Sequence, residues 1–300
     1  MNYIPQRFLL LLCSVLLFSS IAMGSSPVIP TEYGELIFRC NEKSPDQLFI
    51  IGISHRDSLT RLNSSQTPKV QTEVYRIGDW LIHHQGTTLL LPEGFFASKP
   101  PVKEGSPSSV GTNSDCPVPL DNPTLEGILA DDAKFINAEM LLKRYHELRL
   151  QQVEDLMIYE DVRKAIQKLS SCKSEGDALI LKSELDYLQA KRTAAMLQRI
   201  PAIIDEGYGN GNIRGKRAIF TIGLSHLPQI IRYLNEHKIT VYPSLRASGK
   251  DKGYVAELNL LKENFGISII IPRTLAKDPK ILEMNGLGKI VAQSRKSALP

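Results

Sequence analysis

Two short apolar runs of nearly the same sequence dominate the hydrophobic pattern of this chain. Residues 48–55 read LFIIGISH and residues 219–226 read IFTIGLSH, so that five of eight positions are identical. Each run of β-branched and other apolar residues is typical of a buried strand, and each ends in Gly-x-Ser-His. Open α/β sheets bind ligands at the carboxyl ends of their strands. We therefore expect the two histidines, His55 and His226, to face one crevice.

Further apolar runs predict the other strands of the sheet. The strongest of these, residues 87–94, ends in Glu93 followed by a glycine. The glycines of the repeated segments, Gly52 and Gly223, are expected to allow a tight turn at the strand ends, where a Cβ atom would obstruct it. Three weaker runs also predict strands: 35–39, 239–242 and 267–271.

Apolar residues at helical spacing predict the remaining elements. A helix over 70–82 is expected to end at Gly86, and one over 177–200 is expected to stop at Pro201. The stretch 125–169 is too long for one typical globular helix, so we expect two helices or one bent helix. Two shorter helices are predicted in the carboxyl-terminal part: 228–237 and 255–264.

The order of these elements predicts an α/β fold with a central mixed β-sheet flanked by helices and a helical insertion around 125–200. Residues 98–124 are rich in Pro, Ser, Gly and Asn, which indicates a long loop or lid. The glycine-rich stretch 205–217 precedes a strand instead of following one, which is the wrong context for a phosphate-binding loop. A mobile loop over the site is the simpler interpretation.

The first 24 residues have the pattern of a signal peptide. Arg7 supplies a positive charge, residues 8–18 form an apolar run, and residues 22–24 read Ala-Met-Gly, a small-x-small cleavage pattern. We expect an exported protein, periplasmic or secreted, in which residues 25–300 form a single domain without a stable membrane span after cleavage. An uncleaved anchor is the alternative.

Composition narrows the class of protein further. The net charge of +4 is small and evenly spread, which argues against a nucleic-acid partner. Cys40, Cys116 and Cys172 follow the signal peptide, and their spacing matches no zinc signature. Export permits one disulfide and one remaining buried thiol, but the sequence does not decide which two cysteines pair.

His55, His226 and Glu93 form a candidate metal site. Two imidazoles and one carboxylate are the minimum set that holds a divalent cation and leaves positions open for water and substrate. The alternatives are that each histidine is a satisfied structural residue and that Glu93 caps a helix or faces solvent.

Arg192 is the second candidate catalytic residue beside Glu93. It falls on the same helical stripe as Leu188 and Met196, and that stripe is expected to be buried. A buried guanidinium needs an anionic partner, so Arg192 either holds Glu93 in place or binds a substrate oxyanion. The alternative is an arginine that snorkels from the edge of the stripe.

The other histidines receive no role from the sequence. His83 and His84 are neighbours at a helix end, where adjacent side chains diverge, so they are interpreted as surface residues. His146 and His237 are predicted on helices without partners. Ser225 lacks the second glycine of a serine-hydrolase elbow, and a serine next to its histidine in sequence does not form a catalytic triad.

The ordered set of motifs resembles the Tiki/TraB/GumN family, whose superfamily also contains erythromycin esterases and ChaN-like haem-uptake proteins. The resemblance rests on Gly52 to His55, on Glu93 after the next strand, on Arg192, and on Gly223 to His226, over about residues 48–242. It implies an α/β domain with a central sheet, and some members of the family are metal-dependent proteases. The Gly-Ile-Ser-His form of the first motif and the loop at 98–124 depart from the family pattern.

Two functions follow as hypotheses. The first is an exported metal-dependent hydrolase with a peptide or a small molecule as substrate, in its narrower form a peptidase, whose two histidines and Glu93 hold Mn, Co or Zn. The cation would acidify a water, and Arg192 would stabilise the oxyanion, or Glu93 would act as the general base. The second is a non-catalytic exported protein that binds haem, a metal or a peptide in the same crevice.

Overall fold

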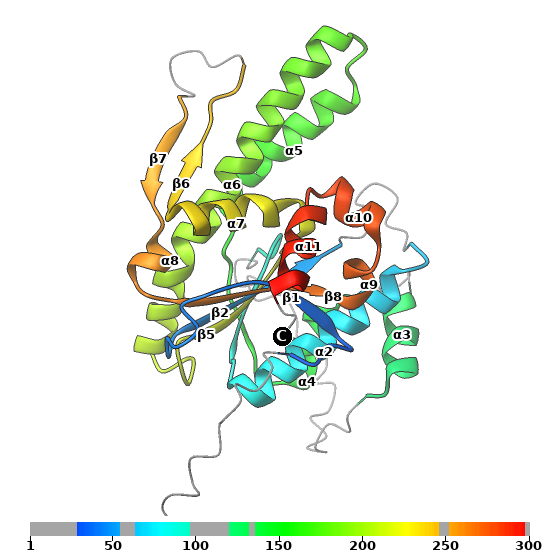
Figure 1. Ribbon diagram of the computed structural model, residues 1–300, viewed down its shortest axis with the longest axis vertical. Coiled ribbons are helices and arrows are strands. Elements are labelled where there is room, and N and C mark those ends of the chain that lie inside the picture. Colours follow the sequence, from blue (N-terminus) through cyan, green and yellow to red (C-terminus); the bar gives the residue numbers. More distant parts are fainter. Residues whose placement is uncertain (1–28, 55–63, 97–119, 132–135, 246–251, 298–300) are drawn as a thin grey trace, which may run out of the picture.

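The computed structural model describes residues 29–54, 64–96, 120–131, 136–245 and 252–297 (Figure 1). Its centre is a six-stranded sheet in the order β1-β8-β2-β5-β3-β4. Five of these strands run parallel, and β1 pairs antiparallel with β8 at one edge. Helices flank this sheet, which confirms the predicted α/β class with a central mixed sheet.

The strands of the central sheet are short and mostly buried. They are β1 (Gly34–Cys40), β2 (Gln47–Ile53), β3 (Leu89–Pro92), β4 (Arg149–Leu150), β5 (Arg217–Gly223) and β8 (Gly266–Pro272). A separate hairpin consists of β6 (Lys238–Val241) and β7 (Tyr254–Glu257).

The helices lie between and around these strands. Those before β5 are α2 (Thr67–Gln85), α3 (Asn122–Ala130), α4 (Ala138–Tyr145), α5 (Leu156–Ser170) and α6 (Glu175–Gly209). Those after it are the 3₁₀ turn η1 (Leu224–His226), α7 (Leu227–Glu236), α8 (Asn259–Lys262), α9 (Arg273–Ala276), α10 (Pro279–Met284) and α11 (Gly288–Ser297). In Figure 1, α5 and the first part of α6 form an arm that extends away from the sheet.

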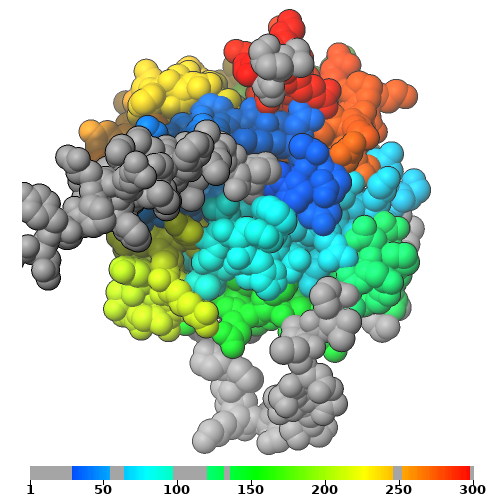
Figure 2. Space-filling model, turned by 60° about the horizontal axis from the view of Figure 1, so that its bottom comes forward, coloured from blue at the N-terminus to red at the C-terminus, as the bar shows by residue number. Residues whose placement is uncertain are grey.

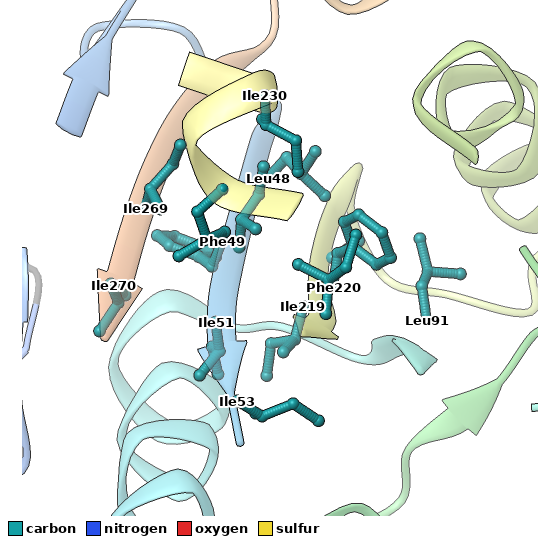
Figure 3. Packing of buried hydrophobic residues seen from close by; sticks show 14 of the residues in the cluster. Leu48, Phe49, Ile51, Ile53, Leu91, Ile219, Phe220, Ile230, Ile269 and Ile270 are labelled. Atoms are coloured by element: carbon teal, nitrogen blue, oxygen red, sulfur yellow. The ribbon is translucent and has the colours of Figure 1, made fainter. Parts of the chain in front are cut away.

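The two repeated segments become neighbouring parallel strands in the middle of the sheet. β2 and β5 pair along their whole length, from Gln47 opposite Arg217 to Ile53 opposite Gly223. Both strands are almost entirely buried, and Figure 3 shows Leu48 and Ile51 of β2 packed between residues of β5 and β8. A continuous apolar run is what a central parallel strand requires, because helices cover both of its faces.

Gly52 lies inside β2, not in a turn, and its role is close packing. A Cβ atom at this position would lie 2.5 Å from Cδ1 of Leu227 and 2.9 Å from Cδ2 of Leu224. The missing side chain therefore makes room for Leu224, which is part of the second copy of the motif, and for Leu227, which follows it. The predicted tight turn at Gly52 is wrong, because the strand continues to Ile53.

Several element boundaries differ from those that the spacing predicts. The stretch 125–169 contains parts of three helices and the short strand β4, because β4 pairs with β3 at the sheet edge. The helix α6 runs through Pro201, whose neighbours Ile200 and Ile204 are completely buried. Their burial offsets the one backbone hydrogen bond that the proline cannot make.

The carboxyl-terminal part also contains corrections. The predicted helix at 255–264 begins as β7, since its backbone pairs with β6, and only the short α8 follows. β6 does not join the central sheet. The glycine-rich stretch 205–217 finishes α6 and leads into the amino end of β5, so it does not cover the carboxyl edge of the sheet.

Some predictions concern residues outside the described ranges. These residues include the signal peptide within 1–28, His55, Cys116 and most of the loop at 98–124. Of the described cysteines, Cys40 and Cys172 are both free thiols, so they do not form the predicted disulfide with each other. Within the described ranges, no helix combines the length and the apolar character that crossing a bilayer requires.

The packing around Gly52 predicts the effect of a single methyl group. Gly52→Ala should lower the free energy of unfolding by about 1–3 kcal/mol in urea denaturation, because both leucines must move in a filled core. The control is Gly127→Ala on α3, where a Cβ atom has no heavy atom within 4 Å. That variant should gain about 0.5–1 kcal/mol from helix propensity. Equal stability of Gly52→Ala and the wild type would contradict the packing explanation.

Candidate active site

Three parallel strands, β2, β5 and β3, end at the same edge of the sheet. Pro92 lies opposite Thr221, and Ile53 lies opposite Gly223. The backbone N–H of Glu93 donates to the carbonyl of Thr221 at 2.9 Å, which extends the ladder by one residue. The side chains that follow these strands therefore meet at one edge. His55 follows Ile53 by two positions but lies outside the described residues.

Glu93 directly follows β3 at this edge, and its side chain is only 7% exposed. Its Oε2 accepts a hydrogen bond of 2.6 Å from the backbone N–H of Gly223, the last residue of β5. Its Oε1 lies 2.8 Å from Nη1 of Arg192 and 3.4 Å from Nε2 of His226. The structure thus brings together the three predicted site residues that it describes.

Arg192 is buried between two carboxylates. Besides Glu93, it contacts Glu154 through two donors: Nε donates to Oε2 at 3.1 Å and Nη2 pairs with Oε1. Its guanidinium also lies over the ring of Tyr159, 5.2 Å from the centroid. Burial alone lowers the pKa of Arg192, but the hydrogen bond that Arg192 donates to Glu154 and the charges of both carboxylates outweigh it, so the pKa is raised. Arg192 therefore stays charged and holds Glu93 in place.

Glu154 is the residue that sequence reasoning missed. Its side chain is completely buried in the loop between β4 and α5, and its Oε1 also accepts from the backbone N–H of Gly94 at 3.1 Å. In the sequence, the next residue, Asp155, indicates where α5 begins. Its carboxylate caps this helix by accepting hydrogen bonds from the N–H groups of Met157 and Ile158. A helix that begins at this cap leaves Glu154 in a loop at the sheet edge.

His226 is oriented by a threonine of α6. Its Nδ1 lies 2.6 Å from Oγ1 of Thr193, and this hydroxyl also donates to the carbonyl of Gln189 at 2.9 Å. A hydroxyl has one proton, so the network assigns the proton between Thr193 and His226 to Nδ1 of the imidazole. The other ring nitrogen, Nε2, faces Oε1 of Glu93 at 3.4 Å.

The ionisable groups of this site lie close together and are buried. Two carboxylates, Glu93 and Glu154, face the guanidinium of Arg192, and the imidazole of His226 faces Glu93. Buried groups of this kind are stable only with partners of complementary charge, and a carboxylate beside an imidazole can share a proton or a cation.

A second cluster of ligand-type side chains lies outside this edge. The ligand atoms of Asp79, His83 and His146 all lie within 4.8 Å of one another, which makes this cluster a possible metal-binding triad in the described part of the chain. The interpretation of His146 as a residue without a partner is wrong, because its Nε2 lies 3.1 Å from Asp79. His84 does not face Asp79 but stacks on Trp80. Adjacent helical residues such as His83 and His84 project in different directions.

Comparison of the chain with known protein families, with curated proteins and with solved structures found no match. The interpretation of the site therefore rests on its own geometry and chemistry.

The ion pairs of Arg192 with Glu93 and Glu154 predict that replacing Arg192 strongly lowers the stability of the protein. Arg192→Met leaves two buried carboxylates without their cation, so it should lower the free energy of unfolding by about 3–5 kcal/mol in chemical denaturation. Arg214→Ala is the control, because the side chain of Arg214 is 83% exposed and its ion pair should contribute under about 1 kcal/mol.

A double-mutant cycle separates the contribution of the Arg192–Glu154 ion pair from the effect of the lost side-chain volume. Combining Arg192→Met with Glu154→Gln should give a coupling energy of about 1–3 kcal/mol, because each change removes the same buried interaction. Additive losses in the double variant would show that the two side chains do not stabilise each other.

Proposed function

We propose that this protein is an exported metal-dependent hydrolase that acts on peptides. The observation that carries the proposal is the pair of donor atoms at the carboxyl edge of the sheet. Nε2 of His226 and Oε1 of Glu93 lie 3.4 Å apart and are both buried. Two ligands that are each about 2 Å from one zinc ion, at a tetrahedral angle, lie about 3.3 Å apart.

The donor set fits a divalent cation in its chemistry as well as in its spacing. Thr193 holds His226 through Nδ1, which is how metal-binding histidines are commonly oriented by a second residue. The two carboxylates around Arg192, Glu93 and Glu154, make the surroundings of this position acidic, which suits a cation. His55, two residues beyond the end of β2, is the third ligand in this proposal. Imidazole and carboxylate donors suit Mn, Co or Zn.

When bound, such a cation supplies a Lewis acid that polarises a carbonyl and acidifies water. The residues of this chain have separate tasks around it. Glu93 is a fixed ligand, because donors from Arg192 and Gly223 hold both of its oxygens. Arg192 is a positioning residue instead of the oxyanion donor that the sequence also allowed, since its N–H groups are directed at two carboxylates.

A cavity of about 510 Å³ between α6, α7 and β6 offers space for a substrate. It is lined by Ala190, which lies two residues before Arg192, and by Ser225, which precedes His226. Arg232 also lines this cavity, and its buried Nε has no hydrogen-bond partner among the described residues. A carboxylate of a peptide is a suitable partner for such a guanidinium.

The ordered motifs that resemble the Tiki/TraB/GumN family support the same class of activity. The signal-peptide pattern supports export, and a periplasmic or secreted location is part of the proposal.

The test combines metal content with peptide hydrolysis. The purified full chain, loaded separately with Mn, Co or Zn, is incubated with a mixture of peptides, and the products are identified by mass spectrometry. His226→Ala and Glu93→Gln should lose at least about 100-fold in turnover and should no longer retain the metal at this site. Thr193→Val should lose about 10- to 100-fold in metal affinity, because it frees the imidazole.

The control is His237→Asn, which replaces a histidine outside the site. His237 has a left-handed backbone conformation, with φ of 56°, that asparagine tolerates. It should keep both metal and turnover. Metal bound without any hydrolysis would overturn the hydrolase and favour a binding protein, and a shifted Soret band after haem titration would identify haem as its ligand.

A further inference from the structure

The cluster of Asp79, His83 and His146 lies at the opposite end of β3 from Glu93. Asp79 and His83 belong to the last two turns of α2, and His146 caps the end of α4. The cluster lines a cavity that also includes Thr88, the residue before β3. Five strand residues span about 16 Å, so one ion cannot serve both places. Figure 2 shows the surfaces of α2 (cyan) and the α4 region (green) side by side on this face.

Both imidazoles direct a nitrogen at the same carboxylate oxygen. Oδ1 of Asp79 lies 3.1 Å from Nε2 of His146 and 3.4 Å from Nε2 of His83. The two rings meet edge to face, with centroids 5.3 Å apart. Asp79 and His83 are four residues apart on one helix, so they project from the same face. Three donors from two helices therefore converge on one point.

Hydrogen bonding within the protein does not fully satisfy this cluster. Nε2 of His146 is buried without a well-aligned hydrogen-bond partner among the described residues, although Asp79 is near.

Arg76, the nearest cation on α2, does not occupy the position between the three donors. Its Nε donates to the side chain of Asn122 at 2.9 Å, and its Nη2 contacts the carbonyl of Leu120. Arg214 and Glu147, which also line the cavity, pair with each other at 3.1 Å.

We propose that Asp79, His83 and His146 form a second metal site, which binds a divalent cation of the zinc class. Two imidazoles and one carboxylate suit Zn, Co, Ni or Cu, whereas Ca and Mg prefer oxygen ligands. A cavity of about 980 Å³ adjoins the cluster, so a fourth coordination position is open to water or a small ligand. His83 is 61% exposed, so the bound ion exchanges with solvent.

The experiment uses the full chain with His226→Ala, which disables the first site. Zinc binding is measured by isothermal titration calorimetry, and Co or Cu binding is followed by quenching of Trp80, the single tryptophan of the chain, which lies next to Asp79. One ion per chain should bind. Added zinc should also raise the melting temperature, because a ligand that binds only the folded state stabilises it.

His84→Ala is the matched control for His83→Ala. Both histidines lie in the last turn of α2, but His84 stacks on Trp80 and does not face Asp79. In the His226→Ala background, His83→Ala and His146→Ala should each weaken zinc binding at least tenfold and remove the shift in melting temperature, whereas His84→Ala should keep both. His83 is exposed, so His83→Ala gives the answer even when His146→Ala does not fold.

Two results would overturn this second site. One is the absence of zinc binding in the His226→Ala chain, and the other is binding that His83→Ala leaves unchanged. Failure of the first site gives a different result, because the wild type would then bind no more zinc than His226→Ala.

Discussion

Arg192 connects most of the elements that build the carboxyl edge of the sheet. Its guanidinium joins Glu93 after β3 to Glu154 before α5, and the next residue of α6, Thr193, orients His226 after β5. A charge buried to this degree is stable only with its partners in place. The arm of helices is therefore anchored to the sheet by the same ion pairs that position the candidate active site. Stability and chemistry depend here on one set of contacts.

The pairing of the repeated segments explains why this edge can gather side chains. β2 and β5 are parallel neighbours, so the residues that follow both strands emerge on the same side. The absence of a side chain at Gly52 lets Leu224 and Leu227 pack closely against β2. This close packing fixes the start of α7, and therefore the position of His226, relative to the strand that precedes His55.

The two ends of β3 differ in their chemistry. At the carboxyl end, the donors are almost completely buried and are held by a network of fixed partners. At the amino end, Asp79, His83 and His146 border a large cavity, and His83 is largely exposed. A buried, oriented donor pair suits catalysis, because it needs little reorganisation, whereas an accessible triad suits reversible binding of an ion.

The local pattern of apolar and polar residues is sufficient to predict the class of fold and part of the site. Apolar runs marked the central strands, and the polar residues directly after them, Glu93 and His226, lie at one edge because parallel strands share their carboxyl ends. The helical stripe likewise marked Arg192 as buried. These features depend on neighbours within a few residues, which the order of the chain shows directly.

Only the tertiary structure determines which side chains contact these residues. Glu154 is 38 residues from Arg192. It belongs to a stretch whose apolar residues have helical spacing, but in the structure β4 pairs with β3 and interrupts this stretch. The triad of Asp79, His83 and His146 joins the ends of two helices whose packing no local pattern encodes. Contacts between distant segments depend on the packing of the whole core, so periodicity alone does not reveal them.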